Sequence, residues 1–194
     1  MQTNSIATTR ATAPLSHLPL RLHHRAIVVR DQEVTRHFIE DILGIPLIAT
    51  WCERIRMPEM DRDVEFCHTF FGLGDGSALA FFQFADPEVQ QLCLPMEAPK
   101  VPRFDHIALK VDSRIQTEII GRLEAAGVPY RITNHGYCKS VYVTSPDGLY
   151  LEFANDPPDQ EEIDRTQRGS AHQELARWLA GRRESNNDYR QRDF

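Results

Sequence analysis

Hydrophobic and polar positions alternate in two short runs that each begin with histidine. Residues 24–29 read HRAIVV and residues 106–111 read HIALKV, so successive side chains of each run lie on opposite faces of a predicted strand. A segment with apolar residues at near-helical spacing follows each run. The apolar positions of these two segments are Val34, Phe38, Ile39 and Ile42, and Ile115, Ile119 and Leu123. The pattern therefore predicts a strand followed by a helix at two places in the chain.

The two predicted helices end in the same way. LGIPL at 43–47 and AGVPY at 126–130 each place a glycine at the helix C-cap and a proline that prevents the helix from continuing. Gly44 follows the first histidine by 20 residues (24 to 44), and Gly127 follows the second by 21 (106 to 127). Two copies at this spacing indicate a duplication rather than a solenoid.

Further strand-like runs complete each copy. They lie at 64–71, 77–85, 138–145 and 148–154, with hairpin turns predicted at GDG (74–76) and SPDG (145–148). Each copy reads as a strand, a helix and three strands, of which these runs are the last two. The predicted fold class is α+β, with two paired βαβββ modules that form a curled mixed sheet. The last strands, FQFADP (82–87) and LEFANDP (151–157), align Gln83 with Glu152.

The same patterns divide the chain into three parts. We expect a flexible tail at 1–19, a domain at 20–155 with modules 20–95 and 100–155, and a polar, partly helical extension at 156–194. In the extension, Leu175, Trp178 and Leu179 form an apolar stripe at helical spacing. We expect this stripe to pack on the body of the chain or on a second copy, in a homodimer or higher oligomer.

Composition limits the classes of function. The net charge of −6 argues against nucleic acid as a partner, and the longest apolar runs are too short to span a membrane. The four cysteines show no C-x-x-C spacing, and no signal peptide precedes them. We therefore expect reduced cysteines and a cytoplasmic protein.

His24, His106 and Glu152 are the candidate metal ligands. The two histidines open equivalent predicted strands, and Glu152 alternates with the apolar Leu151 and Phe153 in a late strand. If those apolar residues pack under the helices, Glu152 projects onto the concave side of the sheet. Two imidazoles and one carboxylate bind one side of a divalent metal and leave the other side open for substrate.

With these residues in place, the chain resembles the vicinal oxygen chelate superfamily. That superfamily includes glyoxalase I, fosfomycin-resistance and bleomycin-binding proteins, methylmalonyl-CoA epimerase and type I extradiol dioxygenases. The resemblance covers about residues 20–155 and implies paired βαβββ modules curled around a metal. Its four ligand positions fall on His24, Gln83, His106 and Glu152.

A second resemblance lies within the second module. The segment TNHGYCKSVYVTSPDGLYLE (133–152) is similar to the extradiol dioxygenase signature, except that Ser145 stands where another small or acidic residue is usual. This resemblance implies Fe(II), with His135 as acid or base and Tyr142 as a hydrogen-bond partner of a catechol-like substrate. A further histidine of that family is replaced at Ser77, and His68 is the possible substitute.

The sequence leaves three functions open. The first is an extradiol-type dioxygenase that uses Fe(II), or Mn(II), to cleave a catechol-like aromatic with dioxygen. The second is a glyoxalase- or epimerase-type lyase or isomerase with Ni, Co or Zn, in which Gln83 is a fourth ligand. The third is a binding protein that sequesters a drug or metabolite. A site flanked by His135 and Tyr142 favours the dioxygenase, and a site with four protein ligands favours the lyase.

Overall fold

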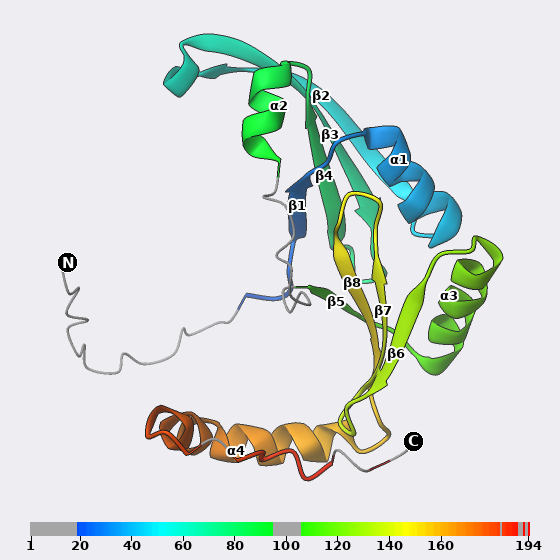
Figure 1. Ribbon diagram of the computed structural model, residues 1–194, viewed down its shortest axis with the longest axis vertical. Coiled ribbons are helices and arrows are strands. Elements are labelled where there is room, and N and C mark those ends of the chain that lie inside the picture. The colour runs from blue at the N-terminus through cyan, green and yellow to red at the C-terminus, as the bar shows by residue number, and fades with distance from the viewer. Residues whose placement is uncertain (1–18, 95–105, 183, 190–191, 193) are drawn as a thin grey trace.

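The first module contains four strands and its covering helix. The computed structural model describes residues 19–94, 106–182, 184–189, 192 and 194 (Figure 1). The predicted tail, apart from residue 19, lies outside these residues, as does most of the link between the modules. In chain order the elements are β1 (His24–Val28), α1 (Gln32–Arg36) with a π-helical continuation (His37–Ile42), β2 (Leu47–Met57), a 3-10 turn (Pro58–Met60), β3 (Arg62–Gly72), β4 (Ala78–Phe84) and α2 (Pro87–Cys93).

The second module repeats this order, and a long helix follows it. Its elements are β5 (Ile107–Lys110), α3 (Ser113–Ala125), β6 (Tyr130–Asn134), β7 (Lys139–Thr144) and β8 (Tyr150–Asn155), followed by α4 (Gln160–Leu179). The strand orders are β1-β4-β3-β2 and β5-β8-β7-β6, with one parallel pair in each sheet. These two mixed sheets confirm the predicted α+β class and the paired βαβββ modules. The sheets do not close on one another.

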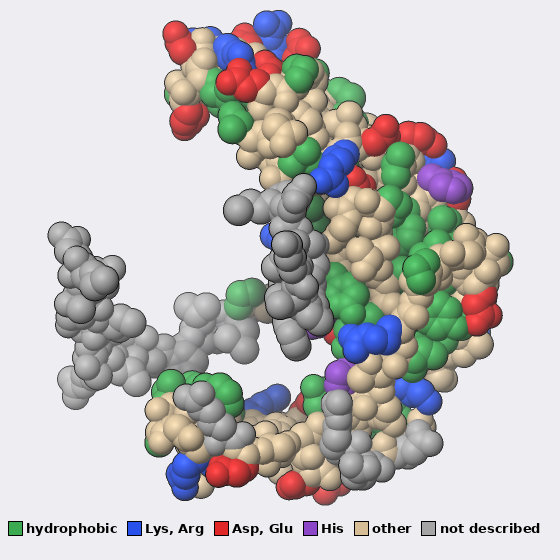
Figure 2. All heavy atoms as spheres, in the orientation of Figure 1, with side chains coloured by type: hydrophobic (Ala, Val, Ile, Leu, Met, Phe, Trp, Pro, Cys, Tyr) green, Lys and Arg blue, Asp and Glu red, His purple; other side chains and the backbone are tan. Residues whose placement is uncertain are grey.

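The two modules share one hydrophobic core under their helices. Phe38 and Ile39 of the first module belong to the same buried cluster as Leu123 and Phe153 of the second. Helices α1 and α3 cover one side of the sheets, and the other side is a concave surface between the modules (Figure 1). Figure 2 shows the molecule hollowed on that side. Polar groups also join the modules, because the Asp147 carboxylate accepts a hydrogen bond from the Thr35 hydroxyl at 2.5 Å.

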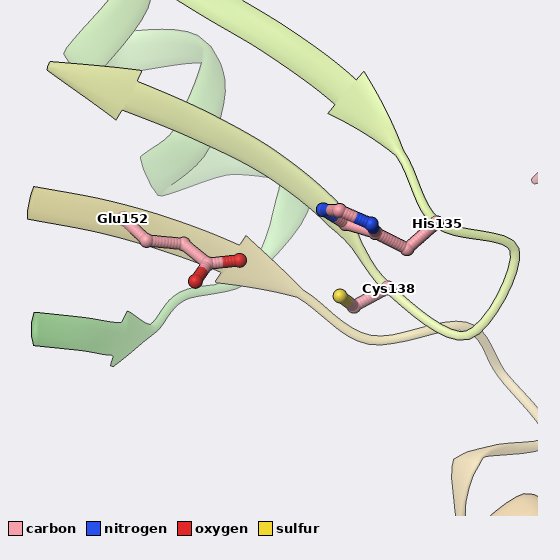
Figure 3. A group of neighbouring side chains, drawn as sticks. All are labelled: His135, Cys138 and Glu152. Carbon is pink, nitrogen blue, oxygen red and sulfur yellow. The ribbon is translucent and has the colours of Figure 1, made fainter. Parts of the chain in front are cut away.

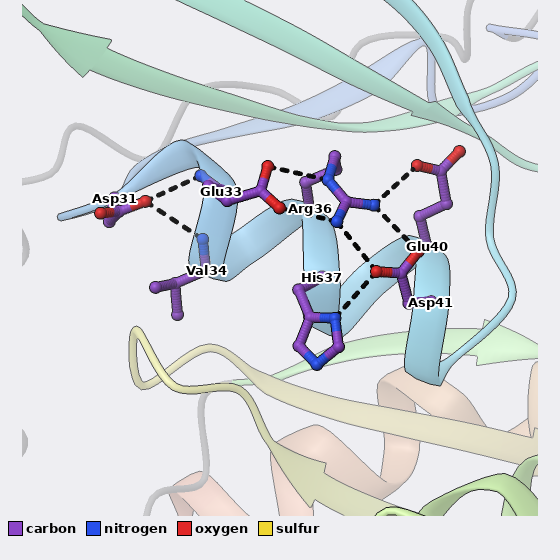
Figure 4. Close-up of polar contacts among 7 residues, drawn as sticks. All are labelled: Asp31, Glu33, Val34, Arg36, His37, Glu40 and Asp41. Carbon is purple, nitrogen blue, oxygen red and sulfur yellow. Dashed lines mark hydrogen bonds and ion pairs between the residues drawn. The ribbon is translucent and has the colours of Figure 1, made fainter.

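Local signals in the sequence explain where the helices begin and end. Asp31 and Asp112 cap the N-termini of α1 and α3 through their side chains, as Figure 4 shows for α1. Gly44 and Gly127 follow the helices with φ angles of 78° and 66°, which the missing Cβ permits. In Figure 4, Arg36 also binds the surrounding carboxylates of α1 and its continuation. The predicted helix ends are therefore confirmed.

A glutamine in the first turn of each helix ties that helix to the last two strands of its sheet. Gln32 Nε2 donates to the carbonyls of Cys67 and Phe81, at 3.3 and 2.9 Å. Gln116 Nε2 donates to the carbonyls of Lys139 and Phe153, both at 2.8 Å. The accepting carbonyls are equivalent in the two sheets, although Gln32 is the first residue of α1 and Gln116 is the fourth residue of α3.

Helix α4 and the residues after it lie outside the two modules. Leu175, Trp178 and Leu179 on α4 are 56%, 52% and 75% exposed. The expectation that they pack on the body of the chain is therefore wrong, because α4 extends away from the sheets (Figure 1). Packing on a second copy stays a prediction. None of the described helices is both long and apolar enough to cross a membrane.

Candidate metal centre and active site

One row of side chains crosses the concave face of the second sheet. The strand register pairs Ala108 with Glu152, Glu152 with Tyr142, and Tyr142 with Arg131. Leu151 and Phe153 on either side of Glu152 belong to the buried core. Because side chains alternate along a strand, Glu152 points away from that core, as predicted. The row therefore presents a carboxylate, a phenol and a guanidinium to one surface.

Glu152 is a buried carboxylate with three hydrogen-bond donors. Its side chain is 7% exposed, and its Oε2 lies 2.6 Å from His106 Nε2. Its Oε1 accepts hydrogen bonds from the hydroxyls of Ser140 at 2.5 Å and Tyr142 at 2.9 Å. These donors offset the cost of burying the carboxylate and fix its orientation.

His135 extends this network through Tyr142. Its Nε2 lies 2.9 Å from the Tyr142 oxygen. Since Tyr142 has one proton and donates it to Glu152, His135 Nε2 is the donor of this bond. Burial, followed by the hydrogen bond to Glu152, raises the pKa of Tyr142 to about 12. Tyr142 therefore stays a neutral phenol that relays a hydrogen bond from His135 to Glu152.

A group of three potential ligand atoms lies beside this network. Among the described residues, only His135, Cys138 and Glu152 bring three such atoms within 4.8 Å of one another. Figure 3 shows Glu152 on its strand with His135 and Cys138 beside it. Burial raises the pKa of the Cys138 thiol, whose sulfur lies 3.5 Å from the Ser140 hydroxyl. Cys138 and Ser140 were not predicted as site residues, although Ser140 lies on the same face of the sheet as Tyr142 and Glu152.

The C-terminal segment holds the turn that carries His135. Asn187 Nδ2 donates to the His135 carbonyl at 3.0 Å, and Asn134 Nδ2 donates to the Arg192 carbonyl at 2.9 Å. The Arg192 guanidinium binds both carboxylate oxygens of Asp159, at 2.8 and 2.7 Å. The C-terminal extension therefore supports the backbone of the candidate site.

His24 lies among aromatic residues of the first module. Its ring is 5.5 Å from Phe70 and 6.1 Å from His68, measured between ring centroids, and its Nδ1 is 2.7 Å from His23 Nδ1. His68 stacks on Phe82 at 3.6 Å, and burial, followed by the charge of His24, lowers its pKa. These contacts do not join His24 or His68 to Glu152, so the structure brings together His106, Glu152, Tyr142 and His135 without them.

Gln83 lies on the opposite face of its sheet from the site. It alternates with Phe82 and Phe84, and it shares strand parity with Leu79 and Phe81 in the buried core. Its Oε1 accepts the backbone N–H of Gln32 at the start of α1, at 2.8 Å. The sequence alignment of Gln83 with Glu152 is therefore wrong. Ala80 pairs with Ala26 of β1 as Glu152 pairs with Ala108 of β5, so Ala80 is the residue equivalent to Glu152.

The site lies on an open sheet face rather than in an enclosed pocket. A crevice of about 830 Å³ runs between the modules on the other side of the second sheet, where it is lined by Leu109, Ile119 and Phe153. The row from Ala108 to Arg131 contributes only Ala108 to that crevice. We place the candidate site by its chemistry, because ligand-type side chains converge at Glu152.

Comparison with known proteins agrees with this architecture. The glyoxalase/bleomycin resistance protein/dioxygenase superfamily matches residues 21–153, which is more than half of the chain, and the chain belongs to this family. None of the curated proteins matches it.

Two solved structures show the same fold. A variant of the fosfomycin resistance protein FosX from Listeria monocytogenes, complexed with Mn(II) and 1S,2S-dihydroxypropylphosphonic acid, is 17% identical with a TM-score of 0.50, over 74% of this chain and 98% of that one. A glyoxalase/dioxygenase from Nostoc punctiforme is 19% identical with a TM-score of 0.50, over 77% and 99%. At this identity the likeness concerns the fold alone.

The donor set at Glu152 suits a divalent cation. An imidazole nitrogen and a carboxylate oxygen already converge, and the buried carboxylate has a fixed orientation. Nitrogen and oxygen ligands of this kind bind Fe(II), Mn(II) and Zn(II). The second module therefore has the chemistry of a metal site, with Tyr142 and His135 beside it.

Proposed function

We propose that this protein is a metal-dependent dioxygenase that opens the ring of a catechol-like substrate. The observation that carries the proposal is the Tyr142 hydroxyl, which joins Glu152 to His135 through bonds of 2.9 Å each. A hydrogen-bonding phenol and an acid-base imidazole are thereby held next to the candidate ligand. This is the arrangement that the resemblance of residues 133–152 to the extradiol dioxygenase signature implies for ring cleavage.

The proposed ligands are His106 and Glu152, with His24 as the third on the basis of the repeat. When bound, Fe(II) would supply the Lewis acidity that lowers the pKa of catechol hydroxyls and a path by which the catechol itself reduces dioxygen, both atoms of which enter the ring-opened product. Mn(II), which the FosX complex contains, is an alternative ion. The Tyr142 oxygen would orient the substrate by accepting a hydrogen bond from one of its hydroxyls, and His135 would donate or accept a proton at Nε2.

The lyase or isomerase function is less well supported. It requires four protein ligands, and Gln83 was the candidate for the fourth. The Gln83 amide lies on the helix-covered face and is bound to the backbone of Gln32. We therefore favour the dioxygenase.

The test is dioxygen uptake by the Fe(II)-loaded protein under reducing conditions with a panel of catechols. We expect uptake and a yellow ring-opened product for at least one of them. His135→Ala should slow turnover by roughly 100-fold or more with unchanged iron content, because an acid-base group is lost. His37→Ala is the matched control, since His37 is exposed and bound to Asp41 on the outer helix. An iron-loaded protein that neither binds nor oxidises any catechol would contradict the proposal.

A further inference from the structure

Arg131 forms the basic end of the row that contains Tyr142 and Glu152. It lies on β6, directly opposite Tyr142 in the strand register. Its guanidinium carbon is 4.7 Å from the centroid of the Tyr142 ring, and its Nη2 donates to the Tyr150 hydroxyl at 3.0 Å. The Tyr142 and Tyr150 rings are stacked with centroids 5.4 Å apart. Two aromatic side chains therefore hold Arg131 on the concave face.

The charge of Arg131 is not neutralised by the part of the chain that the structure describes. Some of the described arginines pair with carboxylates, as Arg36 does with Glu33 and Arg192 does with Asp159. No described carboxylate lies within 4.0 Å of the Arg131 guanidinium, which is exposed and bonded to a neutral phenol. A guanidinium has five N–H donors in a planar fork, so several remain for a ligand.

The equivalent row of the first module has no such charge. There the register pairs Ala26 with Ala80, Ala80 with Phe70, and Phe70 with Ala49. Ala49 thus occupies the place of Arg131, and Phe70 that of Tyr142. The fold does not need a cation at this position, and the guanidinium occurs only in the row that also holds the candidate ligand.

We propose that Arg131 binds a carboxylate on the substrate, so that the substrate class is an anionic, carboxylate-bearing catechol. This inference rests on the proposed function of the same site. The guanidinium fork matches the two oxygens of a carboxylate. At the other end of the row, the ion that Glu152 would hold takes the two vicinal hydroxyls of the catechol, so the carboxylate is left for Arg131. The row therefore fixes the direction of the substrate, with its hydroxyls toward Glu152 and its carboxylate toward Arg131.

Because the chain has a net negative charge, binding of an anionic substrate depends on Arg131. At −6 the protein as a whole repels an anion, so an acidic substrate needs a specific positive group at the site. Tyr150 and Tyr142 limit the movement of Arg131, which lowers the entropy that binding would cost. A neutral substrate would gain nothing from this arrangement.

The test compares 3,4-dihydroxybenzoate with its neutral isostere 3,4-dihydroxybenzamide in binding titrations of the Fe(II) protein without dioxygen. We expect the wild-type protein to bind the acid roughly 10-fold or more tightly than the amide, the size of a charged hydrogen bond. Arg131→Gln should remove this preference, and Arg131→Lys should retain part of it. Arg168→Gln, on the exposed surface of α4, should leave it unchanged. Equal binding of acid and amide by the wild-type protein would overturn the proposal, whether or not the variants fold.

A second pair of probes separates this inference from the ring-cleavage proposal. Benzoate and benzamide lack vicinal oxygens, and their binding to the metal-free protein can be followed by NMR. Binding of benzoate, but not benzamide, that Arg131→Gln removes would support the anion site even if no catechol is cleaved. Cleavage of catechols with no preference for the acid would support the dioxygenase and overturn the role of Arg131.

Discussion

The two modules share a frame and differ in the row that faces the concave surface. In the second module this row reads Ala108, Glu152, Tyr142 and Arg131, whereas in the first it reads Ala26, Ala80, Phe70 and Ala49. Every polar position of one row is apolar in the other. The contacts that hold the frame, by contrast, recur in both modules, as the glutamine anchors show.

This difference indicates how a duplicated fold separates stability from chemistry. Residues on the helix-covered face must match in both modules, because they fill a common core. Residues on the concave face have no such restriction, so one module can carry the polar network while the other presents aromatic rings. We infer that the second module contains the reacting groups and that the first supplies a largely apolar wall.

The largest expected effect is on metal affinity. Glu152→Gln keeps the shape of the side chain but removes its charge, and His106→Ala removes an imidazole that lies 2.6 Å from it. We expect each to weaken binding of Fe(II) by roughly 100-fold or more, and the outer-face variant Glu118→Gln to leave it unchanged. Calorimetric titration or metal analysis after dialysis would measure this.

His24→Ala in the same series sharpens the comparison between the modules. A similar loss of affinity would show that the first module contributes a ligand to the ion. An unchanged affinity would mean that the second module holds the metal alone, with His135 and Cys138 within reach of Glu152.

The next effect concerns Tyr142→Phe, which gives the second module the residue that the first has at Phe70. The substitution removes one donor from the buried Glu152 carboxylate and the partner of His135. We expect turnover to fall by roughly 10- to 100-fold and stability by about 1 kcal/mol, with metal still bound. Steady-state kinetics and denaturant unfolding measure the two changes separately. Unchanged turnover would remove Tyr142 from the reaction.

Much of the fold could be predicted from the sequence, because its signals are local. Alternation locates every strand except β2 and β6, and near-helical spacing with the glycines at 44 and 127 marks α1, α3 and their ends. Helix α2 was missed, although Asp86 and Pro87 are a typical helix start.

The site was harder to predict, because register and return contacts are not local. The sequence alignment of the last strands was displaced by three residues, so it matched Glu152 with Gln83 instead of Ala80. Because side chains alternate along a strand, this error placed Gln83 on the wrong face of the sheet. The contacts of Asn187 and Arg192 with the His135 turn join segments more than 50 residues apart in sequence. No pattern along the chain indicates such contacts.

A smaller effect tests the shared frame through its glutamine anchors. Gln116→Leu removes two hydrogen bonds of 2.8 Å to strand carbonyls in a buried place. Gln32→Leu removes the corresponding pair and the hydrogen bond that Gln32 accepts from the Thr69 hydroxyl, where the Gln32 side chain is partly exposed. We expect Gln116→Leu to lower the free energy of unfolding by about 1–3 kcal/mol, and Gln32→Leu by less, because water can reach the freed groups. Urea unfolding measures both. Equal losses of unfolding free energy in the two variants would contradict the expected effect of burial.

The smallest effect is the response of the C-terminal support to pH. The hydrogen bond from Arg192 lowers the pKa of Asp159 below its usual value. A lowered folded-state pKa means that the stabilisation is complete above the usual pKa of an aspartate and is lost as the pH falls through the lowered one. We therefore expect the support of the His135 turn to be constant from neutral pH down to about 5 and to weaken only in stronger acid. Hydrogen exchange of the Gly136 amide, which donates to Asn134, would report this change. In Asp159→Asn, the increase of Gly136 hydrogen exchange in acid should disappear. If exchange increases between pH 8 and 5 and still does so in this variant, a group other than Asp159 is responsible.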